Sequence, residues 1–210
     1  MSAGERPTHR PAAARPRLAV FVSGGGRSLE NLVELARRGE LDVEVALVVT
    51  NKADCFALER ARSHGILAVV LDPGRKLSPA EFGRDAFAAC DAARCELAVF
   101  AGFLRLAEIP DRWEGRVLNV HPSLLPAFGG KGFYGDKVHA AVLGSGVPET
   151  GCTVHYVTNE YDKGPIVLQR RVPVLAGDDV HTLAARVFEA EKLALPEAIR
   201  SHFARRALRP

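Results

Sequence analysis

The residues best suited to chemistry are an asparagine and a histidine, Asn119 and His121, near the end of an apolar run. Alternate side chains of a strand share one face, so both would project from the same side of a sheet. A polar turn further along the chain supplies a carboxylate, Asp162. The amide and a protonated imidazole can hold a developing oxyanion, and the carboxylate can raise the imidazole's pKa and help to move protons. The three residues therefore predict acyl transfer without a covalent nucleophile.

Two of these residues also have an ordinary structural explanation when each is taken alone. His121 fits a satisfied structural histidine, and Asp162 fits a simple turn-former. Their combination favours chemistry, provided that the turn brings Asp162 back to the end of the strand that carries His121. In an open α/β sheet, the carboxyl ends of the strands are where ligands usually bind.

A glycine-rich loop, Ser23-Gly24-Gly25-Gly26-Arg27-Ser28, joins the first apolar run to a helical pattern. Glycines let the backbone approach a ligand, and amides at a helix N-terminus attract anions. Because Arg27 adds a charged donor and Ser28 a hydroxyl, the loop suits a phosphate. The dinucleotide pattern GxGxxG fails, since Leu29 holds the third glycine position, and the Walker pattern is absent. A tight turn without any ligand is the alternative for this loop.

The elements that position these residues follow from the rhythm of the chain, in which apolar runs alternate with helical patterns. This rhythm predicts an α/β fold: a mostly parallel twisted sheet of about seven strands with helices on both faces. Several runs are apolar throughout, as in strands that are buried on both faces. The expected strands are Arg17–Val22, Val43–Val49, Leu67–Leu71, Leu97–Phe100, Arg116–Asn119, Gly151–Val157 and Ile166–Val172.

Helix signals complete this picture. Ser78-Pro79-Ala80-Glu81 combines an N-cap serine, a proline and a capping-box glutamate, and Asp54 and Asp179 are expected to cap two further helices. In the helical pattern Val180–Leu195, Glu191 falls on the apolar stripe, where a carboxylate is out of place unless it faces a partner. A salt bridge to a nearby arginine is the structural alternative.

The composition is that of an ordinary globular protein, with 210 residues, 47% hydrophobic and 25% charged. We expect a disordered tail over Met1–Pro16 and one domain over residues 17–210. The net charge of +3 is small, and no segment resembles a secretory signal, a membrane span or a nucleic-acid footprint. The four cysteines lack metal-ligand spacing. These features predict a cytoplasmic protein, a monomer or homodimer, that acts on small molecules without a metal.

Several strings together resemble one family, the glycinamide ribonucleotide formyltransferases of purine biosynthesis, over residues 17–206. The string NxHPSLLP followed by DxGP is typical of the folate-dependent formyltransferase superfamily, whose fold is Rossmann-like. The shared strings are Ser23-Gly24-x-Gly26, Thr50-Asn51-Lys52-Ala53-Asp54, Ala101-Gly102-Phe103-Leu104-Arg105, Asn119-Val120-His121-Pro122-Ser123-Leu124-Leu125-Pro126 and Asp162-x-Gly164-Pro165.

The resemblance implies that 10-formyltetrahydrofolate gives its formyl group to the primary amine of glycinamide ribonucleotide. It implies that Asn119 and His121 stabilise and protonate the tetrahedral intermediate. Asp162 then keeps His121 charged and relays the proton that leaves the amine. His155 matches a family histidine to which we assign a supporting role, and a buried strand histidine explains it equally well.

The resemblance also implies two binding surfaces. The positions matched to the ribonucleotide are Gly24, Gly25, Gly26, Arg27, Ser28, Lys131 and Glu191. The positions matched to the walls of the pterin pocket are Leu104, Arg105, Leu106, Ala107, Val157, Thr158, Glu160 and Tyr161.

The sequence departs from the family pattern mainly on the acceptor side. Arg27-Ser28 stands where Ser-Asn is usual, and Phe188 stands where a glutamine is common. The loop over residues 127–135 is longer than in well-known members. An arginine that many members carry after the third strand has no clear equivalent, and Arg75 or Lys76 is the candidate substitute. These changes concern the amine acceptor and leave the formyl chemistry untouched.

Related folate-dependent enzymes and a non-catalytic binding module are the alternative functions. The nearest is a formyltetrahydrofolate deformylase, in which water replaces the amine, although that family often has a second histidine at the position of Pro122 and carries an N-terminal regulatory domain. Methionyl-tRNA formyltransferase, which needs a C-terminal domain, and sugar-nucleotide formyltransferases share the core motif. From a different class, a non-catalytic nucleotide- or folate-binding module has no need for Asn119, His121 and Asp162 together. A nicotinamide-linked oxidoreductase is disfavoured by the failed GxGxxG pattern.

Overall fold

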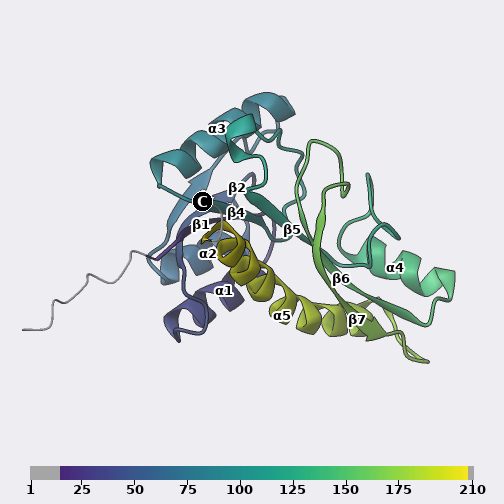
Figure 1. Cartoon of the computed structure of the whole chain (residues 1–210). Helices are drawn as coiled ribbons and strands as arrows, with labels where there is room; N and C mark the ends of the chain where they lie inside the picture. Colours follow the sequence, from purple (N-terminus) through teal and green to yellow (C-terminus); the bar gives the residue numbers. More distant parts are fainter. Residues whose placement is uncertain (1–14, 208–210) are drawn as a thin grey trace, which may run out of the picture.

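A computed structural model describes residues 15–207, so the expected tail lies almost wholly outside the described residues. Its centre is one seven-stranded sheet with the strand order β3-β2-β1-β4-β5-β6-β7 (Figure 1). The strands are β1 (Arg17–Val22), β2 (Glu44–Thr50), β3 (Leu67–Val70), β4 (Leu97–Phe100), β5 (Val117–His121), β6 (Glu149–Tyr156) and β7 (Ile166–Pro173).

The first five strands pair in parallel, and β6 and β7 join the sheet antiparallel. The predicted seven-stranded, mostly parallel sheet is therefore confirmed. Strand β5 runs further than predicted and ends at His121. Its pairing with β6 sets Asn119 opposite His155 and His121 opposite Thr153. The register of two neighbouring strands thus brings Asn119 and His155 together.

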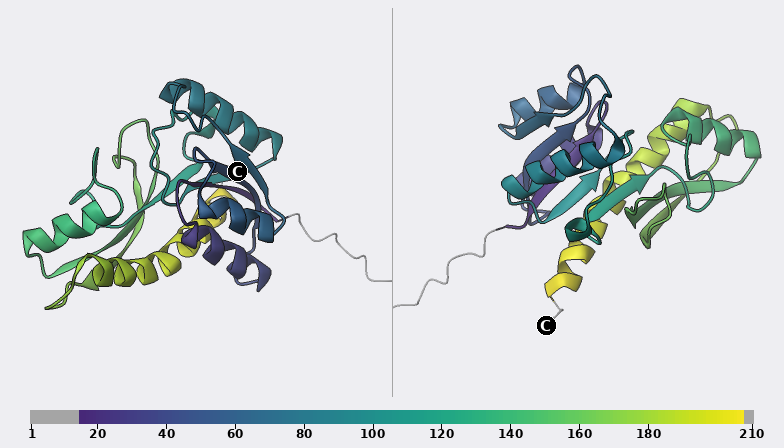
Figure 2. Two further views of the ribbon diagram at one scale, coloured as in Figure 1. Left: turned by 180° about the vertical axis from the view of Figure 1, so that it is seen from behind. Right: turned by 90° about the horizontal axis from the view of Figure 1, so that it is seen from above.

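Helices cover both faces of the sheet (Figures 1 and 2). One face packs on α3 and the short helix η1 through an aromatic core that contains Phe21, Phe87 and Trp113. The other face packs on α1, α2 and α5, where Leu32 and Val187 are buried. The helices are α1 (Arg27–Arg37), α2 (Phe56–Ser63), α3 (Pro79–Ala92), η1 (Asp111–Trp113), α4 (Asp136–Ser145) and α5 (Val180–Ala207).

Two of the three predicted helix caps are present. Ser78 and Glu81 form the full capping box of α3, and the Asp179 carboxylate accepts a hydrogen bond from the Thr182 amide at 2.8 Å. The prediction for Asp54 is wrong. Cys55 is the N-cap of α2 and its backbone is still extended, so Asp54 lies one residue too early to cap the helix.

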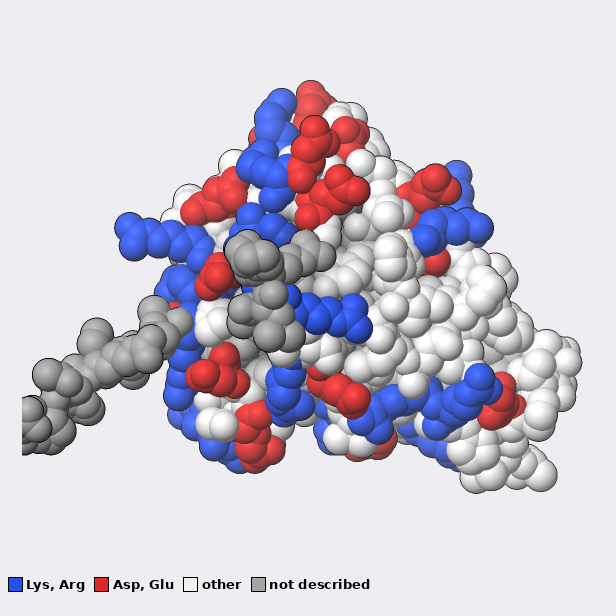
Figure 3. All heavy atoms as spheres, viewed as in Figure 1, with Lys and Arg blue, Asp and Glu red and all other residues white. Residues whose placement is uncertain are grey.

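The surface and the helices carry two further observations. On the face shown in Figure 3, lysines and arginines are interspersed with aspartates and glutamates rather than gathered into one basic patch. No helix within residues 15–207 is both long and apolar enough to cross a membrane.

Candidate active site

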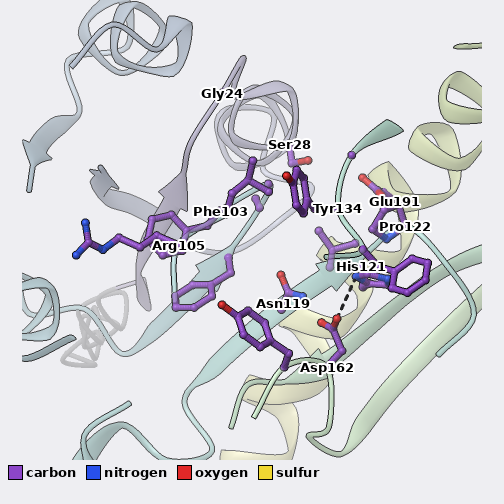
Figure 4. Close-up of a pocket in the computed structure, with 18 of the residues that line it drawn as sticks. Gly24, Ser28, Phe103, Arg105, Asn119, His121, Pro122, Tyr134, Asp162 and Glu191 are labelled. Carbon is purple, nitrogen blue, oxygen red and sulfur yellow. Dashed lines mark ion pairs between the residues drawn. The ribbon is translucent and has the colours of Figure 1, made fainter. Parts of the chain in front are cut away.

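A cavity of about 350 Å³ opens at the carboxyl ends of β1, β4 and β5, where ligands bind in open α/β sheets (Figure 4). Loops from both halves of the chain and the middle of α5 complete its walls. Its lining residues are Gly24–Ser28, Phe100–Ala107, Asn119–Pro122, Gly130, Gly132–Asp136, His139, His155, Val157, Thr158, Glu160–Asp162, Ala184, Phe188 and Glu191.

His121 is buried at the end of β5, on the same side of the strand as Asn119. Its Nε2 lies 2.9 Å from the carbonyl oxygen of Phe128. Because a carbonyl can only accept, Nε2 carries the hydrogen, and Nδ1 holds the lone pair of the neutral ring. Nδ1 lies 3.7 Å from Oδ2 of Asp162 (Figure 4). The structure thus brings the predicted histidine and carboxylate together, with the reactive nitrogen facing the carboxylate.

Asp162 is held in the turn between β6 and β7 by a left-handed backbone, with φ 54°. Its Oδ2 accepts a hydrogen bond from the Gly130 amide at 2.8 Å. The next glycine of the motif, Gly164, packs so closely against the Tyr156 carbonyl that a Cβ atom has no room there. The glycine of DxGP is therefore needed for the turn that delivers the carboxylate.

His155 connects the amide to the carboxylate. Its Nδ1 donates to the Tyr156 carbonyl oxygen at 2.9 Å, which leaves Nε2 to accept from the Asn119 amide at 3.1 Å. The same Nε2 lies 3.5 Å from Oδ1 of Asp162. His155 lines the cavity as well. The supporting role that we predicted for His155 has a matching geometry, because it fixes the orientation of Asn119.

The pKa of His121, beside Asp162, differs from our expectation. Burial lowers the pKa of His121 below its usual value, and this effect outweighs the opposing influence of Asp162. The direction of this shift is opposite to the one that we expected from Asp162. Burial alone would raise the pKa of Asp162, yet the hydrogen bond that a protonated His155 can donate, the charge of a protonated His121 and the Gly130 amide bring it below its usual value. The pKa of His121 and the pKa of Asp162 are thus both shifted downward in this site.

The glycine loop forms the opposite end of the cavity and leads directly into α1. Gly26 is the N-cap of α1, with φ 70°, and no side chain caps the helix. A Cβ on Gly26 would lie 2.8 Å from the Cβ of Ala57. Arg60 of α2 donates to the Gly25 carbonyl oxygen at 2.9 Å. The first amides of α1 are thus left for an anion, in a loop that α2 holds in place.

Glu191 reaches the same end of the cavity from α5. It makes no ion pair or hydrogen bond with any residue between 15 and 207, so the salt bridge considered from the sequence is not formed. Burial raises the pKa of Glu191 to about 8, although the charge of Arg27 acts in the opposite direction. A carboxyl group without a partner that lines a cavity indicates a ligand contact.

The predicted pterin walls all line the cavity, namely residues 104–107, 157, 158, 160 and 161. Arg105 points away from Asn119 in Figure 4, and its guanidinium pairs with Asp72 at 2.6 Å. Lys131 is exposed and is not a lining residue. Arg75 and Lys76, the candidate substitutes for the missing arginine, do not line the cavity either.

One lining residue that sequence reasoning missed is His139, which enters the cavity from α4. The ring is buried, and its Nδ1 has no hydrogen-bond partner within the described part of the chain. Burial lowers its pKa, while Asp136 acts in the opposite direction. Like Glu191, His139 is a polar residue on a buried helix face, and that was the available sequence signal.

Within residues 15–207 no group of three or more potential ligands could hold a metal ion.

Comparisons with known proteins identify the family of the chain. The family model described as formyl transferase matches residues 16–199. The chloroplastic phosphoribosylglycinamide formyltransferase of Vigna unguiculata is 43% identical over 84% of the chain, which spans 57% of that relative's length. The phosphoribosylglycinamide formyltransferase of Escherichia coli K12 is 36% identical, with 87% of this chain and 84% of that protein covered. The crystal structure of glycinamide ribonucleotide transformylase 1 from Symbiobacterium toebii superimposes with a TM-score of 0.81 at 38% identity, covering 95% of this chain and 92% of that one.

Proposed function

The chain belongs to the formyl transferase family, and on this premise we propose that it transfers the formyl group of 10-formyltetrahydrofolate to the primary amine of glycinamide ribonucleotide. The observation that carries the proposal is the arrangement of Asn119, His121 and Asp162 at one end of a cavity whose other end suits a phosphate. The relatives named as phosphoribosylglycinamide formyltransferases support the same acceptor.

The donor fits the side of the cavity between residues 104–107 and 157–161. Leu104 is 48% exposed there, so an apolar surface is open to a flat ring. Bound at this wall, the folate places its formyl group toward Asn119 and His121.

The reaction joins the amine nitrogen to the formyl carbon and breaks the bond from that carbon to N10 of the folate. As the amine attacks, negative charge develops on the formyl oxygen, and the Asn119 amide is placed to donate to it. Nδ1 of neutral His121 accepts the proton that leaves the amine, and Asp162 stabilises the imidazolium that results. His121 then delivers the proton to N10, so the ring ends in the state in which it began. The lowered pKa of His121 suits this sequence, because the histidine must start neutral.

The acceptor's phosphate is assigned to the glycine loop. The amides of residues 26–28 and the Ser28 hydroxyl supply donors at the N-terminus of α1. Glu191 faces the sugar part of the acceptor from α5. A deformylase, which uses water, has no need for this end of the cavity. The unpaired polar groups there favour the transferase over the hydrolase.

The test is an assay of the purified protein with 10-formyltetrahydrofolate, with and without glycinamide ribonucleotide. We expect loss of the formyl group only when the amine is present, with formylated ribonucleotide as the product. Formyl loss at the same rate without the amine would show a hydrolase instead.

A further inference from the structure

Arg27 opens helix α1 and projects toward α5 across the acceptor end of the cavity. Its guanidinium carbon lies 4.1 Å from the centre of the Phe188 ring. The guanidinium makes no ion pair or hydrogen bond with any other described residue. Arg27 is exposed, so its guanidinium has a stacking partner while its N–H donors stay open to a ligand.

The stacking partner lies on a stripe of α5 that faces the cavity, made of Ala184, Phe188 and Glu191. Residues three and four apart share one face of a helix, so Phe188 and Glu191 are neighbours there. Without the ring, the flexible arginine side chain could turn toward the Glu191 carboxyl and pair with it. With the ring in place, Arg27 stays on the aromatic face, and no ion pair with Glu191 forms.

This geometry points to a positioning role, and we infer that Phe188 holds the Arg27 guanidinium in place to bind the phosphate of the acceptor. The inference rests on the proposed phosphorylated acceptor and deepens it. Stacking on a ring face leaves the in-plane N–H groups of a guanidinium free, and these match the oxygens of a phosphomonoester. Arg27 and Phe188 both depart from the family pattern at this site, and the structure shows them in contact.

The experiment measures binding of ribose 5-phosphate by calorimetry and the steady-state constants for both substrates, with the full chain. Replacing Phe188 by leucine keeps an apolar side chain and removes the ring. We expect Phe188→Leu to weaken ribose 5-phosphate binding and raise the acceptor KM about threefold to fivefold, with kcat and the donor KM unchanged. Phe188→Tyr keeps the ring and should behave like the wild type.

The decisive measurement introduces Phe188→Leu into a protein that already lacks the Arg27 side chain. Arg27→Ala should weaken ribose 5-phosphate binding about tenfold or more, and adding Phe188→Leu to it should have no further effect. An equal loss in both backgrounds would overturn the inference, because the ring would then act on the ligand or the fold rather than through Arg27. A Phe188→Leu protein with wild-type affinity would overturn it as well.

The chain offers a matched control in a second arginine–phenylalanine pair, Arg60 over Phe56 at 5.0 Å. Arg60 is also fixed by Glu30 at 2.6 Å and by the Gly25 carbonyl oxygen, so Phe56→Leu should leave ribose 5-phosphate binding unchanged. Measuring ribose 5-phosphate binding and formyl transfer separately also distinguishes this inference from the proposed function. If ribose 5-phosphate binding shows the Arg27–Phe188 coupling but no formyl reaches glycinamide ribonucleotide, the reaction is wrong and the positioning role stands.

Discussion

The two ends of the cavity are built in opposite ways. At the catalytic end, His121, His155 and Asp162 each contact another protein group, and the ring hydrogens have fixed acceptors. At the acceptor end, Arg27 and Glu191 have no hydrogen-bond or ion-pair partner within residues 15–207. The protein therefore completes the first network by itself, whereas the groups of the second stay open to a ligand.

This difference has a kinetic consequence. A preorganised network acts on charge that develops in the transition state, so damage to it lowers kcat. Groups that only the bound substrate satisfies contribute to binding in the ground state and the transition state alike, so damage to them raises KM. The two ends of the cavity should therefore be separable by which constant a substitution changes.

The largest effect is expected from Asp162→Asn. Asparagine tolerates the left-handed backbone at this position, so the turn should survive while the charge is lost. Without the carboxylate, the imidazolium of His121 loses its stabilising partner, and we expect kcat to fall by about a hundredfold or more with little change in the acceptor KM. Steady-state kinetics at saturating donor measure both constants.

A neighbouring charge provides the control for this substitution. Lys163 is exposed and lies outside the cavity lining, so Lys163→Gln should leave both constants unchanged. If Asp162→Asn turned over at a rate near that of the wild type, the carboxylate would have no part in proton transfer.

The catalytic end was largely predictable from the sequence because its information is local. The string from Asn119 to Pro126 includes the end of a strand, and the Asp162-x-Gly164-Pro165 string is a complete turn. Alternation along β5 placed Asn119 and His121 on one side of the strand. What the sequence could not supply was the extent of burial. That burial reverses the expected direction of the His121 pKa shift.

The acceptor end was predictable only in part because it is assembled from distant segments. The glycine loop was visible, but Arg27 meets Phe188 only through the packing of α1 near α5. His139 enters the cavity through the placement of α4, and the local pattern shows only a polar residue on a buried helix face. Lys131 was assigned to the ribonucleotide from the family pattern alone, and the longer loop leaves its side chain exposed. A contact between remote helices depends on the whole fold, so a short motif cannot encode it.

A smaller effect is expected from Gly26→Ala, which tests the acceptor end alone. The residue has φ +70°, and its new Cβ would lie 2.8 Å from the Cβ of Ala57, so the loop must shift. We expect the acceptor KM to rise about tenfold, with the donor KM unchanged. Gly39→Ala is the matched control, because Gly39 has φ +72° and the new Cβ would have nothing within 4 Å. A fall in kcat for Gly26→Ala as large as that for Asp162→Asn would mean that the two ends are not separable.

The smallest effect concerns the protonation of Glu191. Its pKa of about 8 means that the carboxyl is neutral below that pH and becomes an anion above it. The phosphate of ribose 5-phosphate is already a dianion over this range, so a newly charged Glu191 repels it. We expect calorimetric affinity for ribose 5-phosphate to fall about threefold between pH 7 and pH 9 in the wild type, and to stay constant in Glu191→Gln.

Comparing the two proteins isolates Glu191 from the other titratable groups near this end of the cavity. Burial raises the pKa of the Cys152 thiol to about 12, so it does not titrate between pH 7 and pH 9. Lys137 lowers the pKa of Tyr134, which lines the cavity, but Tyr134 is present in both proteins and its contribution cancels. If the affinity of Glu191→Gln falls as steeply with rising pH as that of the wild type, the carboxyl is not the group that responds to pH. The partnerless glutamate would then no longer distinguish the acceptor end from the catalytic end.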